Sequence, residues 1–397
     1  MDRPTNILFL AIAQTLLWAG LYYIFPALFA RWEISLGYSK TAIASAFTSA
    51  IIISSILAPF VGNLIDRGYG RSILVGSSIL GAIGLIALSF SSGFLIFFVS
   101  WSVIGIALSG CLYEPCFAYV TKVRGTKAKD AIIFITLLAG FAGTVSFPVS
   151  NIFADLINWQ ASARIFAGVI LFFVVPILLI STKSENKHSV NLKPLSNKID
   201  NYKLRNDLIR PEFISLFFSF LALALAHGMV ITHIIPLLIE RNIPNAIQLF
   251  ITALIGPSQV VGRIIMIILQ KQKFSINIIS ALTFILKIVA TIFLIYANNN
   301  IYLLILFVIF QGSGAGMTSI ARPVVTANIM GYERFGSVSG AMAVGYIGGT
   351  ALSPIIGAQI WEWNSYDSML RIISVILLMG FVSYIIALKI NHNNKIN

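Results

Sequence analysis

Ionisable side chains inside long apolar segments are the residues of this sequence that are best placed to do chemistry. Glu114, in CLYEPCFAY, has mostly apolar neighbours and is followed by Pro115. An ionisable group at such depth is costly and is therefore a functional candidate, and the proton affinity of a carboxyl responds to burial and nearby charge. We therefore expect Glu114 to be a proton-coupling residue. The alternative is a structural partner that fixes a helix near a proline kink.

Two histidines lie in AHGMVITHIIP, at His227 and His233. Histidine titrates near neutral pH and can relay protons or bind anionic groups. Six residues apart, the two side chains point well away from each other on a regular helix, so a pocket that holds both needs a bent helix. We expect His233 to be a second proton-coupling residue and His227 to bind substrate, with interhelical packing as the alternative for His227.

Three cations also lie at depth in apolar segments, at Arg263, Lys287 and Arg322. An arginine keeps its charge and can bind a carboxylate or another anion through two hydrogen bonds. Arg322, in TSIARPVV, is therefore a candidate substrate ligand, unless its side chain reaches the nearby cytoplasmic surface along its aliphatic stem. Lys287 is expected either to reach the surface along its aliphatic stem or to face a helix interface.

Polar and aromatic residues of the first apolar segment form a further candidate set. Gln14, Trp18 and Tyr22 recur every four residues and share one helix face, and Tyr23 is adjacent. Aromatic rings with polar tips suit a cavity that binds organic molecules, although Tyr22 and Tyr23 also suit a membrane interface or helix packing. Gln259, in LIGPSQVVGR, adds a polar contact. The predicted substrate-binding set is Gln14, Trp18, Tyr22, Tyr23, His227, Gln259 and Arg322.

The sequence contains none of the common enzyme motifs. There is no G-x-x-x-x-G-K-[ST] loop for ATP, no H-E-x-x-H metal helix and no G-x-S-x-G nucleophile elbow. Cys111 and Cys116 are the only cysteines, and their spacing directs them apart on a helix. We therefore predict a protein that is not an enzyme and binds no cofactor or metal.

The composition is that of a membrane protein. Hydrophobic residues make up 58% of the 397 residues and charged residues 10%, against about 25% charged residues in soluble proteins. A bilayer is spanned by about 20 apolar residues, and twelve runs reach that length. They cover 7–30, 40–65, 72–91, 94–119, 131–156, 162–181, 212–239, 246–270, 274–297, 300–325, 335–359 and 366–390. The predicted fold is an all-α integral membrane protein with 12 transmembrane helices.

One long polar stretch divides the twelve runs into six and six. We predict an N-terminal six-helix bundle over residues 1–181, a cytoplasmic linker over 182–210 and a C-terminal six-helix bundle over 211–397. The two halves look like copies of each other, as in many transporters. FPALFAR at 25–31 matches IPLLIER at 235–241, and Tyr113-Glu114-Pro115 matches Ala321-Arg322-Pro323.

The basic residues indicate orientation rather than nucleic-acid binding. The net charge is +13, but the basic residues lie in short segments between apolar runs, without the basic face and interleaved aromatics of nucleic-acid sites. Nineteen of the 27 Lys and Arg fall on the side that carries both termini, five on the other side and three at membrane depth. Since such residues collect on the cytoplasmic side, we expect both termini in the cytoplasm.

The segment VGNLIDRGYGRSIL, residues 61–74, joins the second and third runs. Its pattern G-x-L-x-D-R-x-x-G-R resembles the loop between helices two and three of the major facilitator superfamily, which reads G-x-x-x-D-R-x-G-R-[RK]. Gly62, Asp66, Arg67, Gly70 and Arg71 match, with one extra residue before the second glycine. Glycines permit tight turns and close helix approach, so we predict a conformational latch. The alternative is an ordinary charged turn.

The resemblance implies a fold and a mechanism for the whole chain. It implies two pseudo-symmetric bundles, a central cavity lined by the fourth and tenth helices, and hence Glu114 and Arg322 facing each other across that cavity. It also implies a peripheral ninth helix, which carries Lys287. In this family, the implied mechanism is transport by alternating access.

We therefore predict a secondary active transporter of the inner (plasma) membrane that moves a small organic solute and is driven by protons. Uptake by symport and efflux of drugs, xenobiotics or toxic compounds by antiport both fit the residues. A membrane-embedded enzyme or assembly factor, and a channel, are remote alternatives. The expected partners are the solute, protons and the lipid bilayer, without nucleic acid, and the expected state is a monomer.

Overall fold

The structure is a computed structural model that describes residues 4–186 and 205–396. Helices account for most of that part of the chain, and no strand occurs in it. The chain divides into two compact units, of which unit 1 comprises Met1–Leu204 and Tyr332–Ala343, and unit 2 comprises Arg205–Gly331 and Val344–Asn397. Helix α16, Phe335–Trp363, therefore begins in unit 1 and continues in unit 2.

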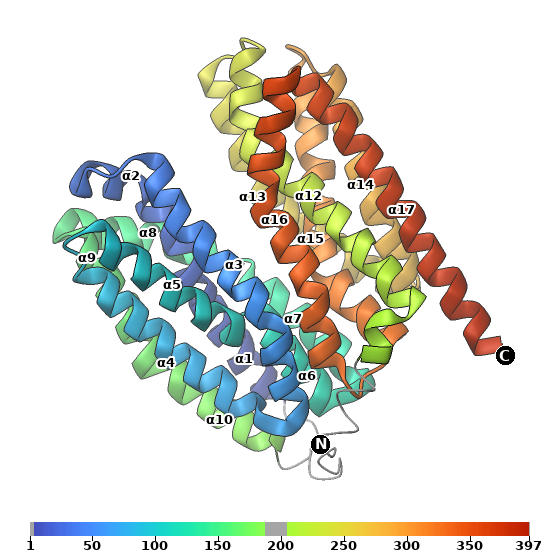
Figure 1. The fold of residues 1–397 in the computed structure, drawn as a ribbon, viewed down its shortest axis with the longest axis horizontal. Helices are drawn as coiled ribbons and strands as arrows, with labels where there is room; N and C mark the ends of the chain where they lie inside the picture. Colours follow the sequence, from blue (N-terminus) through green and yellow to red (C-terminus); the bar gives the residue numbers. More distant parts are fainter. Residues whose placement is uncertain (1–3, 187–204, 397) are drawn as a thin grey trace. The chain divides into compact units, whose positions relative to one another are not determined.

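The helices of unit 1 follow one another through short turns (Figure 1). Their bounds are α1 Pro4–Leu17, α2 Ile24–Leu36, α3 Lys40–Leu64, α4 Gly70–Ser89, α5 Phe94–Cys111, α6 Tyr113–Arg124, α7 Ala128–Ala139, α8 Ala142–Leu156, α9 Trp159–Val169 and α10 Val175–Asn186. Wider π-helical turns, η1 Trp18–Tyr23 and η4 Ile170–Val174, interrupt two of the apolar runs. A third, η2 Ile65–Tyr69, joins α3 to α4, and a 3₁₀ turn, η3 Gly125–Lys127, precedes α7.

Close packing in unit 1 depends on small residues. Helix α3 runs along α5, and α4 runs along both α5 and α9 (Figure 1). A Cβ atom on Gly105 of α5 would lie 2.5 Å from the carbonyl oxygen of Ala50 on α3. Small residues let helix backbones approach in this way inside a membrane.

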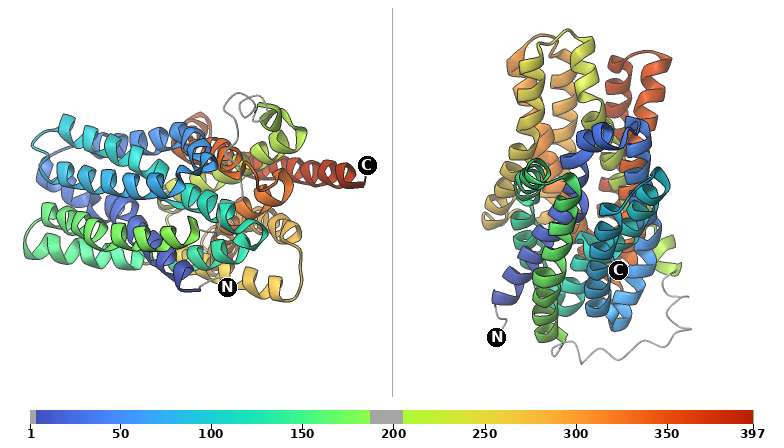
Figure 2. Two further views of the ribbon diagram at one scale, coloured as in Figure 1. Left: turned by 90° about the horizontal axis from the view of Figure 1, so that it is seen from below. Right: turned by 90° about the vertical axis from the view of Figure 1, so that its left-hand side faces the viewer.

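Unit 2 repeats these helix pairings. Its helices are α12 Pro211–Glu240, α13 Asn245–Lys271, α14 Ile276–Tyr296, α15 Ile301–Met330, the later part of α16, and α17 Tyr366–Ile396. Helix α13 packs along α15 as α3 packs along α5, and α14 packs along α15 as α4 packs along α5 (Figure 2). Helix α12 packs along α17 as α1 packs along α10. The all-α fold with two related bundles, predicted from the sequence, is confirmed.

Eleven segments of the described residues are long and apolar enough to cross a membrane. The longest, Thr41–Ser89, has 49 residues and contains both α3 and α4. Gly68 adopts φ 99° within η2, a conformation that glycine tolerates best, and it separates helices of 25 and 20 residues. Each is long enough to span a bilayer, while the count of twelve helices stays a prediction.

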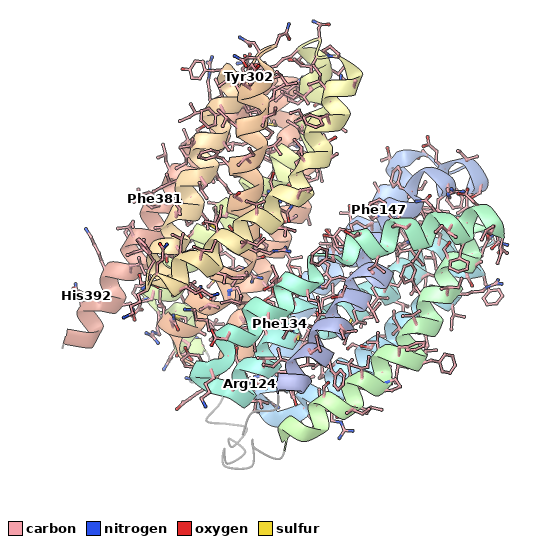
Figure 3. The ribbon with its side chains drawn as sticks, turned by 180° about the vertical axis from the view of Figure 1, so that it is seen from behind. Arg124, Phe134, Phe147, Tyr302, Phe381 and His392 are labelled. Atoms are coloured by element: carbon pink, nitrogen blue, oxygen red, sulfur yellow. The ribbon has the colours of Figure 1, made fainter. Side chains whose placement is uncertain are left out.

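Large apolar side chains remain exposed along the helices, as a lipid-facing surface requires. Phe134 on α7 and Phe147 on α8, labelled in Figure 3, are 42% and 43% exposed. Helices satisfy their backbone hydrogen bonds internally, which is why they can cross a hydrocarbon layer. The chain is a multi-pass membrane protein.

The two units differ from the predicted halves mainly at one segment. Tyr332–Ala343, which the sequence prediction assigned to the C-terminal bundle, clusters with unit 1. The contacts of this segment with α3 and η2, described below, account for that grouping. Of the predicted linker 182–210, residues 187–204 lie outside the described residues.

Candidate functional site

The turn between α3 and α4 holds the beginning of α16. Asp66 Oδ1 accepts a hydrogen bond from the Gly336 N–H at 2.8 Å, and Asp66 Oδ2 accepts from the N–H and the hydroxyl of Ser337, each at 2.6 Å. The first N–H groups of a helix have no partner within it, and the helix dipole favours an anion there. Asp66 therefore caps α16 from a different part of the chain.

Glycines bring α3 and α16 together next to this cap. A Cβ atom on Gly62 would lie 1.9 Å from the Gly336 carbonyl oxygen, and one on Gly340 would lie 2.3 Å from the Ala58 carbonyl oxygen. No larger residue fits these positions unless the backbones separate. Gly62 is thus required by packing against α16.

The remaining motif residues lie on the other side of the turn. A Cβ atom on Gly70 would lie 2.6 Å from the ring of Tyr119 on α6, and the Tyr119 hydroxyl donates to the Thr182 carbonyl at 2.9 Å. Arg67 is exposed and Arg71 is half-buried. The contacts with α16 described above belong to Gly62 and Asp66.

Lys122, one of the nineteen basic residues that the sequence analysis assigned to the cytoplasmic side, supports the turn from α6. Its ammonium donates to the Ile65 carbonyl at 3.0 Å and also to the Asp66 carbonyl. A cation at the end of a helix interacts favourably with the last carbonyls and the dipole. Lys122 therefore fixes the backbone that carries the Asp66 carboxylate.

Glu114 lies in the first turn of α6, directly after a break in the fourth apolar run. Leu112, with ψ −154°, is extended and separates α5 from α6. Pro115 has no N–H and cannot bond the Cys111 carbonyl within a helix. Gln14 Nε2 donates to that carbonyl at 2.7 Å, and both groups are buried. Gln14 thus satisfies the backbone group that the proline leaves open.

The Glu114 carboxyl also reaches α16. Its Oε2 accepts from the Ser339 hydroxyl at 3.2 Å. The crevice around this contact is too narrow for a water molecule and is lined by Ala58, Val61, Gly62, Ser109, Glu114, Pro115, Ala118, Gly336 and Gly340. Two acids, Asp66 and Glu114, therefore hold the first turns of one helix.

An aromatic wall adjoins Glu114. The rings of Trp18 and Tyr113 are 4.7 Å apart, those of Trp18 and Tyr22 are 4.9 Å apart, and those of Tyr22 and Tyr23 are 5.5 Å apart. Tyr113, which was not among the predicted site residues, thereby links Trp18 to the residue next to it, Glu114. The structure brings Gln14, Trp18, Tyr22 and Tyr23 together as their spacing predicts.

Two polar atoms of this wall lack partners in the described part of the chain. The Trp18 indole N–H and the Gln14 Oε1 are buried and make no hydrogen bond there. Buried polar groups are nearly always paired, so an unpaired donor and an unpaired acceptor one helical turn apart mark a place where a polar ligand or water can bind.

Arg322 is buried. The residue is only 5% exposed, so the interpretation in which its side chain reaches the surface finds no support. The guanidinium carbon lies 4.5 Å from the centroid of the Tyr346 ring on α16, which is cation–π geometry. Tyr346 is a contact that the sequence gave no reason to expect.

The two histidines of α12 contact different helices. His227 Nδ1 lies 3.3 Å from Gln311 Nε2 on α15, whereas His233 Nε2 lies 3.0 Å from the Pro354 carbonyl oxygen on α16. The His233 ring is also 5.8 Å from that of Tyr366. The structure thus does not bring the histidines into one pocket.

Gln259 contacts α15 through its backbone. A Cβ atom on Gly316 of α15 would lie 2.0 Å from the Gln259 carbonyl oxygen, so α13 and α15 touch there, while the Gln259 side chain is half-buried. The substrate-binding roles assigned to Gln259, His227 and Arg322, and the proton-coupling roles of Glu114 and His233, stay predictions. Within the described residues, no group of three His, Cys, Asp or Glu could hold a metal ion.

Comparison with known proteins adds relatives that match most of the chain. The MFS transporter asaE of Aspergillus flavus is 22% identical over 338 residues, which are 84% of this chain and 74% of that protein. An MFS-type transporter of Gibberella moniliformis is 25% identical over 349 residues, which are 85% of this chain and 80% of that protein.

Solved structures share the fold. FucP, an MFS transporter crystallised in the outward conformation, has a TM-score of 0.74 at 13% identity, covering 96% of this chain and 98% of that chain. A second structure of FucP, the E. coli fucose:proton symporter, has a TM-score of 0.71 at 15% identity, covering 97% and 98%. The Major Facilitator Superfamily profile matches residues 10–299, so the chain belongs to that family, and this membership points to a transporter rather than an enzyme.

Proposed function

We propose that the chain is a proton-coupled secondary transporter that moves a small organic solute across the inner (plasma) membrane by alternating access. Both termini are cytoplasmic in this proposal, as the distribution of Lys and Arg favours. The observation that carries it is the hydrogen bond between Glu114 Oε2 and the Ser339 hydroxyl, at 3.2 Å. It joins an ionisable group to the helix end that the Asp66 turn also holds.

Proton binding at Glu114 would weaken the hydrogen bond that joins Glu114 to the start of α16. An ionised carboxylate accepts the Ser339 hydroxyl in a charge-assisted hydrogen bond, and such bonds are worth about 1.5–3 kcal/mol. Protonation removes the charge and converts one oxygen into a donor, so the bond weakens. The latch at Asp66 then stands alone, and the start of α16 is easier to release.

The aromatic wall supports an organic substrate with both apolar faces and polar groups. Trp18, Tyr22 and Tyr113 provide rings, while the Trp18 N–H and Gln14 Oε1 provide one donor and one acceptor. Ligand sites combine such apolar surface with a few directed polar groups. A substrate of this kind would present an acceptor to Trp18 and a donor to Gln14.

Direction is proposed with an alternative. FucP is named as a fucose:proton symporter, which supports uptake driven by protons that move inward with the solute. The aromatic wall supports equally the efflux of flat hydrophobic compounds in exchange for protons. Reversing the imposed pH gradient across a liposome separates the two, because symport and antiport accumulate the solute under opposite gradients.

The experiment that tests the function uses the purified chain. A thermal-shift screen of metabolites, cofactor precursors, siderophores and drugs first finds a ligand, since ligands raise apparent stability. Flux of that compound is then measured in proteoliposomes with and without a pH gradient. Saturable, gradient-driven accumulation is the expected result. Flux that does not saturate would indicate a channel, and absence of flux would overturn the transporter proposal.

A further inference from the structure

Lys287 lies in the middle of α14 and is 1% exposed. Of the two sequence interpretations, the structure places it in a helix interface. Lysine is rarely buried without a partner, because its ammonium is strongly hydrated. Such a residue inside a membrane span is a functional candidate.

Two neighbouring helices enclose the side chain. A Cβ atom on Gly314 of α15 would lie 3.0 Å from Lys287 Cγ, so the aliphatic stem fills the space that the glycine leaves. The Lys287 ammonium faces the Leu223 carbonyl oxygen on α12 at 3.5 Å. That distance is the outer limit of a hydrogen bond, and it offsets little of the cost of removing an ammonium from water.

Polar groups of three helices meet here. His227 follows Leu223 by one helical turn on α12, and its Nδ1 lies 3.3 Å from Gln311 Nε2. Gln311 in turn precedes Gly314 by three residues, nearly one turn of α15. Lys287, His227 and Gln311 are called the Lys287 cluster below.

The charges around the cluster are basic or neutral. Away from the helix ends, the titratable or charged residues of the packed helices are His227 and His233 on α12, Arg263 on α13, Arg322 on α15, and Arg371, Tyr384 and Lys389 on α17. The Tyr384 hydroxyl is directed to the Asn277 carbonyl, ten residues before Lys287. Arg322 lies three turns beyond Gln311, against Tyr346.

Acidic residues of the unit 2 helices occur only at helix ends. They are Glu212, Glu240, Glu362 and Asp367, besides Asp207 in the short helical turn before α12. Within the described part of unit 2, no carboxylate pairs with Lys287. A buried charge is tolerated when an opposite charge accompanies it, and the cluster supplies none.

We propose that Lys287 is a proton-binding residue of unit 2, whose amine takes up and releases one proton beside the neutral His227–Gln311 pair. A proton is a ligand that fits, because the stem already fills the space at Gly314. A second cation on His227 would be repelled, so the cluster holds one proton at a time. The use of this proton rests on the proposed proton-coupled transport.

The step balances. When the helices around the cluster admit water, a hydronium ion gives its proton to the lone pair of Lys287 Nζ, an N–H bond forms as an O–H bond breaks, and a water molecule remains. Release is the reverse reaction, in which the Nζ–H bond breaks and water takes the proton.

The test counts protons on the purified, substrate-free chain in detergent. A jump from about pH 9 to about pH 6, a window in which a lysine in water stays charged, is followed with an indicator dye in weak buffer. His227→Gln is compared with His227→Gln/Lys287→Met, so that the imidazole cannot supply the proton. The expected result is that the double variant binds about one proton fewer per chain. Equal counts would overturn the inference, since Lys287 would then be a permanent ammonium.

Two further variants make the result decisive. Lys271→Met removes an exposed lysine at the end of α13 and should leave the count unchanged. Lys287→Arg keeps a fixed charge, so the number of protons bound per chain should again be about one lower. This variant replaces Lys287→Met in the test if Lys287→Met does not give a monodisperse, cooperatively unfolding protein. Because no substrate is present in this test, equal proton counts would leave the proposed transport standing. Conversely, a chain that shows the expected loss of one proton in the Lys287 variants but no flux in proteoliposomes would refute only the proposed transport.

Discussion

Units 1 and 2 share their helix pairings but place opposite charges against their own parts of α16. Unit 1 directs the carboxylates of Asp66 and Glu114 at the start of α16. Unit 2 encloses the cations Arg263, Lys287 and Arg322, and its spans contain no acidic residue away from their ends. The two units therefore share their helix packing but differ in the charged residue types that they carry.

Glu114 and Arg322 show the exchange at one aligned position. Each precedes a proline in the matching tripeptides, and each contacts the part of α16 that belongs to its own unit, Glu114 through Ser339 and Arg322 through Tyr346. A carboxyl can gain and lose a proton, whereas a guanidinium keeps its charge. We therefore expect proton coupling from the first position and anion binding from the second.

The helices that carry these residues also differ. The run of Glu114 breaks at Leu112, whereas Pro323 lies inside the continuous α15. The neighbouring helix offers a reason. Gln14 bonds the carbonyl opened by Pro115, and at the offset of 210 that relates Arg31 to Arg241, its counterpart is Ala224. Alanine has no side-chain donor.

The largest expected effect is that of Glu114→Gln. An amide still accepts the Ser339 hydroxyl but cannot carry a proton, so coupling should be lost while exchange of solute remains. One proton moving down a gradient of about one pH unit drives at most about tenfold accumulation, because about 1.4 kcal/mol corresponds to a factor of ten. Accumulation in proteoliposomes should fall to none, with counterflow kept.

Ser339→Ala is the matched control, since it removes the same hydrogen bond without removing the carboxyl. It should keep the accumulation ratio and change only the rate. If Glu114→Gln accumulates solute as the wild type does, Glu114 of unit 1 does not carry the coupled proton. That result would contradict the proposed difference in chemistry between the two units.

Asp66→Asn tests whether the acid at the turn acts as a latch. The amide can accept one hydrogen bond, but its NH₂ opposes the N–H groups of Gly336 and Ser337. Loss of charge-assisted bonds should cost about 1.5–3 kcal/mol, which favours release of α16. Labelling of Ser109→Cys, in the crevice at Glu114, should then rise in a background without native cysteines.

Arg67→Gln is the control for the latch, because Arg67 is exposed and should not alter the labelling. Unchanged labelling of Asp66→Asn together with normal transport would reduce the turn to an ordinary charged connection, which is the alternative that the sequence left open.

Arg322→Lys tests the basic half. An ammonium cannot reproduce a planar two-bond contact, so affinity for an anionic ligand from the screen should fall by about 1–3 kcal/mol. Arg263→Lys, which changes another buried arginine of unit 2, should leave affinity unchanged. Calorimetry on the variants decides the matter, and equal affinities for wild type and Arg322→Lys would favour a neutral or cationic solute.

Hydropathy and local patterns predicted the helices, the repeat and the turn because each of these depends on residues close together in the sequence. Gln14, Trp18, Tyr22 and Tyr23 do gather on one face, as a period near four requires. Gly62 and Asp66 were identified by their motif, although the motif alone did not reveal what they touch.

The partners were beyond the reach of sequence patterns. Ser337 and Ser339 lie more than 220 residues from the acids that they contact, and no local signal separates them from the other serines of the chain. Lys122 resembled any cytoplasmic cation until its bonds to the turn were seen. For Lys287 the sequence left two interpretations open, and only its burial decides between the surface and a helix interface.

The smallest expected effect concerns the helix break before Glu114, which has no counterpart in α15 of unit 2. Gln14→Met removes the donor to the Cys111 carbonyl, and interhelical hydrogen bonds in membranes contribute on average about 0.6 kcal/mol, at most about 1.7. Pro115→Ala restores a backbone N–H that can bond the same carbonyl, so Gln14→Met should cost nothing further in that background. Thermal unfolding of the two single variants and the double variant forms a double-mutant cycle. Additive losses would show that Gln14 does not act through the open carbonyl, and the contrast with Ala224 would then need another cause.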